Sequence, residues 1–141
     1  MTTAGLDPRV ERVFNALDDQ DAEAVVAEIT DEGVFIETAT DETFTRAEFR
    51  EYLADRIFTA FPDYSVIETK VLTTYNWATV VEYTFQATHE GPLEIGRSKT
   101  PPTGNIITLP IVAVITLAED GITEWRDYVD TQRFAEQLGL D

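Results

Sequence analysis

The segment 125–130 holds the carboxylate best suited to proton transfer. Alternation along a strand puts Trp125, Asp127 and Val129 on one face, and Arg126 and Tyr128 on the other. A carboxylate beside an indole and other apolar groups loses solvation, which raises its pKa toward the range that suits proton transfer near neutrality. Asp127 is therefore a candidate general acid or base. The alternative is an ordinary polar residue on a solvated strand, as most of the 27 acidic residues must be.

His89 is the only histidine of the chain. By strand alternation it shares a face with Trp77, Tyr83 and Phe85. If that face is concave, the imidazole lies near the mouth of a cavity, where it can titrate or donate to a substrate carbonyl. The alternative is a histidine at a strand end that bonds to the Pro- and Gly-rich loop after it.

Aromatic side chains are candidates for the walls of a ligand-binding cavity, namely Trp77, Tyr83, Phe85 and Trp125. A cavity with such walls and few polar groups suits a flat, hydrophobic or aromatic ligand. The alternative is that the same rings simply fill the core. Glu37, Tyr52 and Tyr64 can also reach a cavity of this kind, but the sequence leaves their orientation open.

Several kinds of chemistry have no support in the sequence. The chain has no cysteine, which excludes disulfides, thiol nucleophiles and Cys-rich zinc sites. A single histidine cannot share a metal ion or a proton relay with a second one, and no phosphate-binding loop or nucleophile motif is present. We therefore expect neither a cofactor nor a metal ion.

The charge of the chain is extreme, with 27 acidic against 10 basic residues and a formal net charge of −17. Such a field repels nucleic acids and anionic membranes. The acidic residues are dispersed rather than gathered in a tail, which favours a protein of a high-salt cytoplasm, where charge repulsion is screened. An ordinary acidic protein is the alternative. No segment is long and apolar enough to span a bilayer, and no signal-peptide pattern begins the chain, so we expect a cytoplasmic protein.

Apolar spacing predicts four helices. A stripe at Val10, Val13 and Leu17 follows Pro8, and a second short helix begins at residue 22 and stops at 31–33. Thr45 and Glu48 have the spacing of a capping box, which predicts a third helix through about residue 61. A closing helix is expected over 132–138, ended by a glycine.

The rest of the chain has strand periodicity. We expect strands at 34–38, 64–74, 77–88, 106–117 and 122–130, with a tight turn at 119–121 and a long excursion over 90–105. Helices first and a mostly antiparallel sheet afterwards indicate a single α+β domain over 1–141, with a bent sheet wrapped around the N-terminal helices. The 106–117 strand is apolar on both faces, so we expect a homodimer through the outer face of the sheet.

A series of short motifs lies along the chain: 61–63 (FPD), 88–91 (THEG), 101–104 (PPTG), Pro110, 120–122 (DGI), Asp130 and 137–139 (QLG). In this order and spacing the chain resembles the SnoaL-like polyketide cyclases and related ester cyclases of the nuclear transport factor two-like superfamily. The 125–130 segment is also similar to the last strand of limonene epoxide hydrolases. The resemblance implies a cone-shaped, cystatin-like α+β roll, with Asp127 pointing into its pocket as a general acid or base.

The chain departs from both relatives at the expected polar partners of this acid. Where the resemblance implies a polar residue, often histidine, in the penultimate strand, the chain has Ala113. Where the hydrolases have an arginine and an aspartate two residues apart, it has Tyr83 and Phe85. Epoxide hydrolysis by their route is thus disfavoured, and Ala113 remains a candidate for contact with the substrate without a polar group.

These observations lead to three hypotheses for function. The first, implied by the resemblance, is a polyketide or ester cyclase, or an isomerase, that needs no cofactor and acts on a small hydrophobic carbonyl compound. Asp127 would move the proton, and His89 or a tyrosine hydroxyl would stabilise the enolate. The second is a non-catalytic module that binds a small ligand or forms dimers. The third and weakest is a hydrolase that activates water through Asp127.

Overall fold

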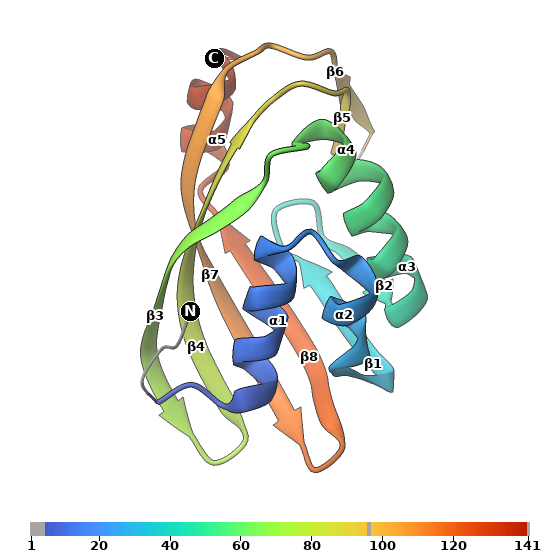
Figure 1. The fold of residues 1–141 in the computed structure, drawn as a ribbon, viewed down its shortest axis with the longest axis vertical. Coiled ribbons are helices and arrows are strands. Elements are labelled where there is room, and N and C mark those ends of the chain that lie inside the picture. The colour runs from blue at the N-terminus through green and yellow to red at the C-terminus, as the bar shows by residue number, and fades with distance from the viewer. Residues whose placement is uncertain (1–4, 96, 141) are drawn as a thin grey trace.

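Helices lie against one side of a bent six-stranded sheet (Figure 1). The structure is a computed structural model and describes residues 5–95 and 97–140. The sheet has the strand order β2-β1-β8-β7-β4-β3, and a separate two-stranded sheet pairs β5 with β6. Neighbouring strands of the large sheet are antiparallel except β1 and β8, which are parallel. The predicted α+β fold with a mostly antiparallel sheet is confirmed.

Capping residues mark the start of α1, α2, α3 and α5, while η1 and α4 have no side-chain cap. They are α1 (Pro8–Asp18), α2 (Ala22–Ala27), α3 (Arg46–Glu51), the π-helical η1 (Tyr52–Ile57), α4 (Phe58–Ala60) and α5 (Thr131–Leu138). Thr45 and Glu48 form the predicted capping box at the start of α3, which continues directly through η1 and α4. Gly139 ends α5 in the left-handed conformation with φ 82°, which glycine adopts without a Cβ clash.

The strands are β1 (Ile29–Glu37), β2 (Glu42–Thr45), β3 (Ser65–Tyr75), β4 (Ala78–Thr88), β5 (Leu93–Ile95), β6 (Ser98–Thr100), β7 (Ile106–Ala118) and β8 (Gly121–Val129). β3, β4, β7 and β8 match the expected ranges to within one residue, while β1 begins well before the expected residue 34. β2 and the β5–β6 hairpin were not predicted. β2 is only four residues long, and β5 and β6 lie inside the segment that was expected to be a long loop.

The expected second helix ends early because β1 takes over its last residues. Ile29, which falls within the expected second helix, instead pairs with Ile122 of β8. Gly33, interpreted as a helix stop, lies inside β1, where an added Cβ would approach both the side chain of Ile29 and the carbonyl oxygen of Ile122. Pairing across the sheet thus overrides a helical pattern that spans only two turns.

The two faces of the sheet differ in burial. On β7 the inward residues from Ile107 to Ile115 are buried, while the alternating outward residues, such as Val112 and Val114, are half-buried. Helix α1 covers the lower part of the inner face in Figure 1, with Val10 and Val13 fully buried. Because the outward residues of β7 remain partly accessible, the second subunit expected over the outer face stays a prediction.

Candidate functional site

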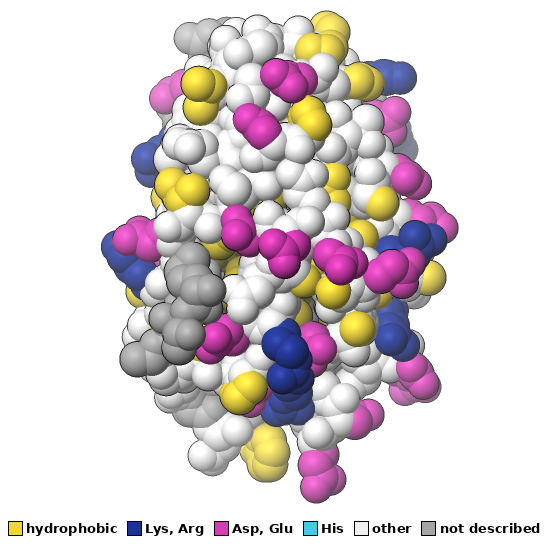
Figure 2. All heavy atoms as spheres, in the orientation of Figure 1, with side chains coloured by type: hydrophobic (Ala, Val, Ile, Leu, Met, Phe, Trp, Pro, Cys, Tyr) yellow, Lys and Arg dark blue, Asp and Glu magenta, His cyan; other side chains and the backbone are white. Residues whose placement is uncertain are grey.

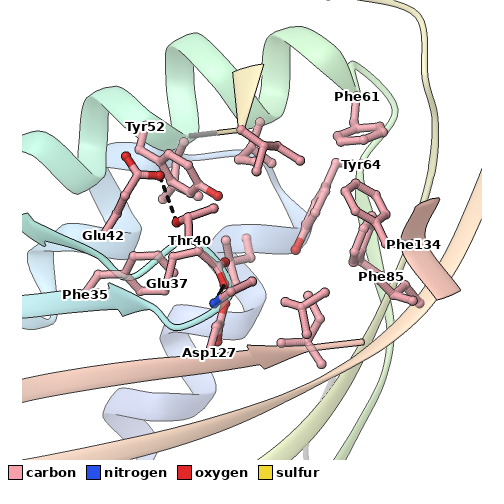
Figure 3. Close-up of a pocket in the computed structure, with 18 of the residues that line it drawn as sticks. Phe35, Glu37, Thr40, Glu42, Tyr52, Phe61, Tyr64, Phe85, Asp127 and Phe134 are labelled. Carbon is pink, nitrogen blue, oxygen red and sulfur yellow. Dashed lines mark hydrogen bonds between the residues drawn. The ribbon is translucent and has the colours of Figure 1, made fainter. Parts of the chain in front are cut away.

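A cavity of about 120 Å³ opens on the inner face, between η1 and the half of the sheet that α1 does not cover (Figure 3). Its walls are mostly apolar and aromatic: Leu17, Phe35, Phe49, Leu53, Ile57, Phe61, Phe85, Leu93, Ile95, Leu109, Ile111, Trp125, Val129 and Phe134. The polar side chains on it are those of Glu37, Thr40, Glu42, Tyr52, Tyr64, Tyr83, Asp127 and Thr131. None of these lining residues is Lys, Arg or His, so the cavity offers no cationic side chain.

The π-helical turn η1 forms the roof of the cavity. Tyr52, Leu53 and Ile57 line it from this one element. A π-turn widens the helix, leaving carbonyl groups without their usual i→i+4 partners, and such turns are frequent at functional sites. The hydroxyl of Thr59 donates to the carbonyl oxygen of Ala54, five residues earlier, at 3.1 Å.

Asp127 lies on the cavity wall with both carboxylate oxygens engaged. The Tyr83 hydroxyl donates to Oδ2 and the Trp125 indole N–H donates to Oδ1, each at 2.7 Å. The side chain is only 5% exposed. Burial raises the pKa of Asp127 to about 7, and the charge of Glu37 adds to this rise, while the two hydrogen bonds oppose it. This carboxyl group therefore changes charge near neutral pH.

Glu37 is a second buried carboxyl group in the same wall. In the parallel pairing of β1 and β8 it lies directly opposite Asp127. It is 9% exposed, and its Oε1 accepts a hydrogen bond of 3.1 Å from the backbone N–H of Ala39. Burial raises the pKa of Glu37, while the hydrogen bond from Ala39 opposes the rise. The cavity thus contains two carboxyl groups that both resist ionisation.

Three tyrosine hydroxyls complete the polar lining. Burial is the main cause that raises the pKa of Tyr52, Tyr64 and Tyr83, so each remains a protonated donor across the physiological range. Tyr83 is committed to Asp127. Figure 3 shows Tyr52 and Tyr64 reaching toward the cavity from opposite sides. Within the described residues no hydrogen bond is found at either of these two hydroxyls, which leaves them able to bind a ligand oxygen.

The rim of the cavity carries a small polar network. Thr40 donates to Glu42 at 2.9 Å, and the Arg56 guanidinium lies 3.7 Å from the same carboxylate. The guanidinium also lies over the rings of Tyr52 and Phe44, at 5.6 and 5.9 Å from their centroids. Arg56 itself does not line the cavity, and its Nη1 is buried without a hydrogen bond among the described residues.

Four of the predicted site residues do meet at the cavity: Asp127, Tyr83, Phe85 and Trp125. The alternation predicted for β8 holds, since Trp125 and Asp127 face inward while Tyr128 is exposed. Trp125 packs edge-on against the rings of Phe14, Phe35 and Phe49, so it is both a core residue and part of the wall.

Trp77 does not belong to the cavity. It lies in the turn between β3 and β4 and is 66% exposed, so the prediction that it forms a wall is wrong in position. Strand alternation assigns a face only inside a strand, and β4 begins one residue later, at Ala78. Ala113 is fully buried opposite Asp127 in the β7–β8 pairing, but it does not line the cavity.

His89 lies outside the cavity as well, at the end of β4, where the alternative interpretation put it. Its ring is fully buried, and Nδ1 accepts a hydrogen bond from the backbone N–H of Thr103 at 3.2 Å. This contact assigns the proton to Nε2, which has no partner among the described residues. Burial lowers the pKa of His89, which keeps the ring neutral. The residue connects the strand to the Pro- and Gly-rich loop.

The surrounding 88–91 motif has the same structural role. Asp63 accepts hydrogen bonds from both the backbone N–H and the hydroxyl of Thr88. Glu90 and Gly91 donate their backbone N–H groups to the carbonyl oxygen of Ala60. An added Cβ at Gly91 would collide with the carbonyl oxygen of Thr59, so only glycine permits this approach. The motif thus fixes α4, which continues from the roof element η1, to the end of β4.

Several cavity residues were not found from the sequence, and the orientation of Glu37 was left open although a usable signal existed. Glu37 shares its strand parity with Phe35, an apolar residue, and this indicates the inner face. The positions of Phe61, Phe134 and Ile95 depend on how α4, α5 and the unpredicted hairpin close over the sheet. Within the described residues, no group of three or more metal-ligating side chains is arranged around a common point.

Comparison with solved structures supports the fold. A candidate polyketide cyclase from Xanthomonas campestris pv. campestris superposes with a TM-score of 0.79 at 18% identity, over 92% of this chain and 93% of that one. A candidate SnoaL-like polyketide cyclase from Jannaschia sp. CCS1 gives 0.76 at 19%, over 100% and 99%. TerC, co-crystallised with polyporic acid, gives 0.71 at 18%, over 94% and 99%. At these identities the likeness is one of fold. No curated protein matches the chain.

The sequence itself provides the assignment to a family. The family model described as SnoaL-like polyketide cyclase matches residues 9–138, which includes every helix and strand of the large sheet except the first residue of α1. No helix of the described residues is long and apolar enough to cross a membrane. The expected resemblance is confirmed: the chain belongs to the SnoaL-like polyketide cyclase family.

Proposed function

We propose that this chain is a cofactor-independent cyclase or isomerase that acts on a small hydrophobic carbonyl compound. The observation that carries the proposal is the environment of Asp127, a carboxyl group in an apolar cavity with a pKa of about 7. A group that is half protonated near neutrality can both take and give a proton. Asp127 supplies the proton transfer by which the ligand carbonyl enolises, and the resulting enol or enolate closes a ring or shifts a double bond.

The cavity is suited to hold the uncharged form of such a ligand. Aromatic walls bind a flat apolar body, and the hydroxyls of Tyr52 and Tyr64 donate to its carbonyl oxygen. A carboxylate or phosphate on the ligand would find no cationic side chain and would meet the two acids of the wall. We therefore expect esters or ketones to bind and the corresponding free acids to be rejected.

Membership of the family and the fold of its neighbours agree with this proposal. The ligand of TerC, polyporic acid, supports a small molecule as the ligand of this chain too. One proton-transfer group contributes on the order of a hundred- to ten-thousand-fold to the rate, so a single carboxyl group is sufficient for a modest enzyme.

The proposal can be tested without knowledge of the natural substrate. 2-Tetralone is a flat hydrophobic ketone whose α-protons exchange in D₂O at a rate that proton NMR measures. The chain should accelerate this exchange, and Asp127→Asn should remove most of the acceleration. Asp120→Asn, the same change in the exposed turn between β7 and β8, is the matched control and should not alter it. No acceleration by the unaltered protein would contradict the proposal.

A second candidate is a module that binds a small ligand without reaction. It is favoured by the lack of polar partners at Ala113 and Phe85, where the resemblance implied them. Tight binding of 2-tetralone that is independent of pH and causes no exchange of its α-protons would support this second hypothesis. The hydrolase hypothesis is weaker, and it would be contradicted if an added epoxide gave no diol.

We also infer that a second copy of the chain covers the outer face of the sheet. Val112, Val114 and Pro110 lie half-buried on this face of β7, with the exposed Tyr128 beside Val112. The face that carries the helices bears many acidic side chains (Figure 2), which supports a protein that is suited to high salt. Light scattering in high salt should give twice the mass of the chain, and Val112→Asp should return the mass to that of a monomer.

A further inference from the structure

We infer that Glu37 is the second catalytic group of the cavity and acts as the base while Asp127 acts as the acid. This inference rests on the proposed function, since it assigns the two halves of one proton-transfer reaction. It is carried by the position of Glu37 in the sheet, by the hydrogen bonds that the two carboxyl groups do and do not make, and by the absence of a cation beside either of them.

The backbone holds the two carboxyl groups side by side. Glu37 is the last residue of β1 and lies opposite Asp127 in the parallel pairing with β8. Directly after it, Thr38 donates both its backbone N–H (3.3 Å) and its hydroxyl (2.7 Å) to the carbonyl oxygen of Asp127. These two bonds fix the register where β1 ends. Both side chains line the same cavity (Figure 3).

The two carboxyl groups differ in how their oxygens are occupied. Asp127 accepts from Tyr83 and Trp125, one donor for each oxygen, and cannot turn without losing a bond. For Glu37 the described residues show a single bond, from the Ala39 N–H to Oε1. Its Oε2 therefore remains free to accept a proton from a ligand carbon. The fixed group is suited to hold a carbonyl oxygen and the freer group is suited to take the proton.

Neither carboxylate has a cationic partner among the described residues, since no ion pair reaches Glu37 or Asp127. A buried carboxylate without a cation lowers stability, because lost solvation is not replaced by a nearby positive charge. Two such groups in one wall are therefore poorly explained as structural features. Paired buried acids with altered proton affinity are instead typical of catalytic sites.

Mutual repulsion separates the two ionisations. The charge of Glu37 contributes to the raised pKa of Asp127, which fits Glu37 losing its proton first. Between these two steps the cavity contains one carboxylate, on Glu37, and one carboxylic acid, on Asp127. This is the combination that an enolisation needs, because a base must act on carbon while an acid acts on oxygen.

The proton balance closes over one turnover. Glu37 takes the proton from the α-carbon, the C–H electron pair forms the enol double bond, and the acid of Asp127 gives its proton to the carbonyl oxygen. The enol carbon then attacks a second carbonyl carbon of the same ligand and forms the new C–C bond. The enol proton returns to Asp127, and the proton on Glu37 passes to the new alkoxide. Both carboxyl groups end as they began.

Exchange of 2-tetralone in D₂O tests this division of roles through its pH profile. We expect the unaltered protein to give a bell-shaped profile, rising as Glu37 ionises and falling as Asp127 loses its proton near pH 7. Glu37→Gln should slow exchange by roughly a hundredfold or more and remove the rising limb. Glu37→Asp keeps the carboxylate, so it should retain the rising limb at a reduced rate. Glu32→Gln, an exposed position on the same strand, is the matched control and should behave as the unaltered protein.

The outcomes separate this inference from the proposed function. If the unaltered protein exchanges 2-tetralone and Glu37→Gln keeps both rate and profile, Glu37 is not the base, although the role of Asp127 survives. If the unaltered protein does not exchange the probe, the proposed function itself fails. Titration followed by carbon-13 NMR measures the pKa of the Asp127 carboxyl directly. It needs no ligand and requires only that the variant folds. Glu37→Gln should lower its pKa below about 7, and an unchanged value would overturn the pairing.

Discussion

The two ends of the cone are built from the same strands but are packed in different ways. At the end under α1, the filled end, side chains such as Val10, Ile115 and Ile122 have no exposed surface. At the other end, Leu109 and Phe85 of the same sheet face the π-turn of η1 and tyrosine rings, and about 120 Å³ stays empty. A straight α-helix closes the first end, while a widened helix stands over the second. The hollow is therefore a product of how the roof is built.

The polar groups follow the same division. The buried carboxyl groups, Glu37 and Asp127, belong to the hollow end or its edge. At the filled end, the inward positions of β7 and β8 are apolar, as at Ile115 and Ile122. The core and the site therefore use one sheet, and the site begins where a helix ceases to fill the space above it.

The largest effect on stability should come from the filled end. Ile122→Ala should lower the free energy of unfolding by about 2–5 kcal/mol, because the close packing leaves a new void. Ile57→Ala, a half-buried position on the cavity wall, should cost less than about 2 kcal/mol, since space already lies beside it. Chemical denaturation of both variants measures the difference. Equal losses would show that the two ends are packed alike.

The second effect is the dependence of stability on pH that Asp127 introduces. Its folded-state pKa of about 7 lies above the ordinary value near 4, so folding favours the protonated form. The contribution is fully present below pH 4 and is lost as pH rises through 7, by up to about 4 kcal/mol. Asp127→Asn should gain stability over the unaltered protein between pH 4 and 8. Thermal unfolding across this range is the measurement, and a constant difference would contradict it.

Tyr83→Phe should give a smaller and more specific effect. The change removes a hydrogen bond that lowers the pKa of Asp127, so this pKa should rise above about 7. The falling limb of the 2-tetralone profile should move to higher pH with it, while stability changes by about 1–2 kcal/mol. Movement of the limb to lower pH would show that the hydroxyl does not stabilise the carboxylate.

The smallest effect should be that of Trp77→Ala. This indole is exposed in the β3–β4 turn, far from the hollow end along the strands, so stability should change by no more than about 0.5 kcal/mol. Exchange of 2-tetralone should be unchanged. A marked loss of exchange would restore the role in the cavity that the sequence had suggested.

Local signals in the sequence predicted the elements that depend on local chemistry. The capping box at Thr45, the glycine that ends α5 and the alternation around Asp127 each specify their structure within a few residues. The long strands were found for the same reason. Membership of the family was also recognisable, because its motifs fix contacts such as that of Gly91 with the roof helix.

The remaining features depend on contacts between distant segments. The π-turn and the β5–β6 hairpin have no short pattern that marks them, and β1 gains Ile29 only through its pairing with β8. Strand parity left two interpretations of His89 open, and only the fold shows that Thr103 of the following loop bonds to its ring. The pairing of Glu37 with Asp127 joins positions 37 and 127 by strand order, which alternation within one strand cannot reveal.

The proposed chemistry depends on a carboxyl group at position 127 that holds its proton near neutrality inside an apolar cavity. Carbon-13 NMR of the protein labelled at aspartate carboxyl carbons measures this directly, with Asp127→Asn to identify the signal. We predict one aspartate that titrates near pH 7 and whose signal is absent from the variant. If every aspartate titrates near its ordinary value of about 4, the group is solvated and the proposed chemistry is contradicted.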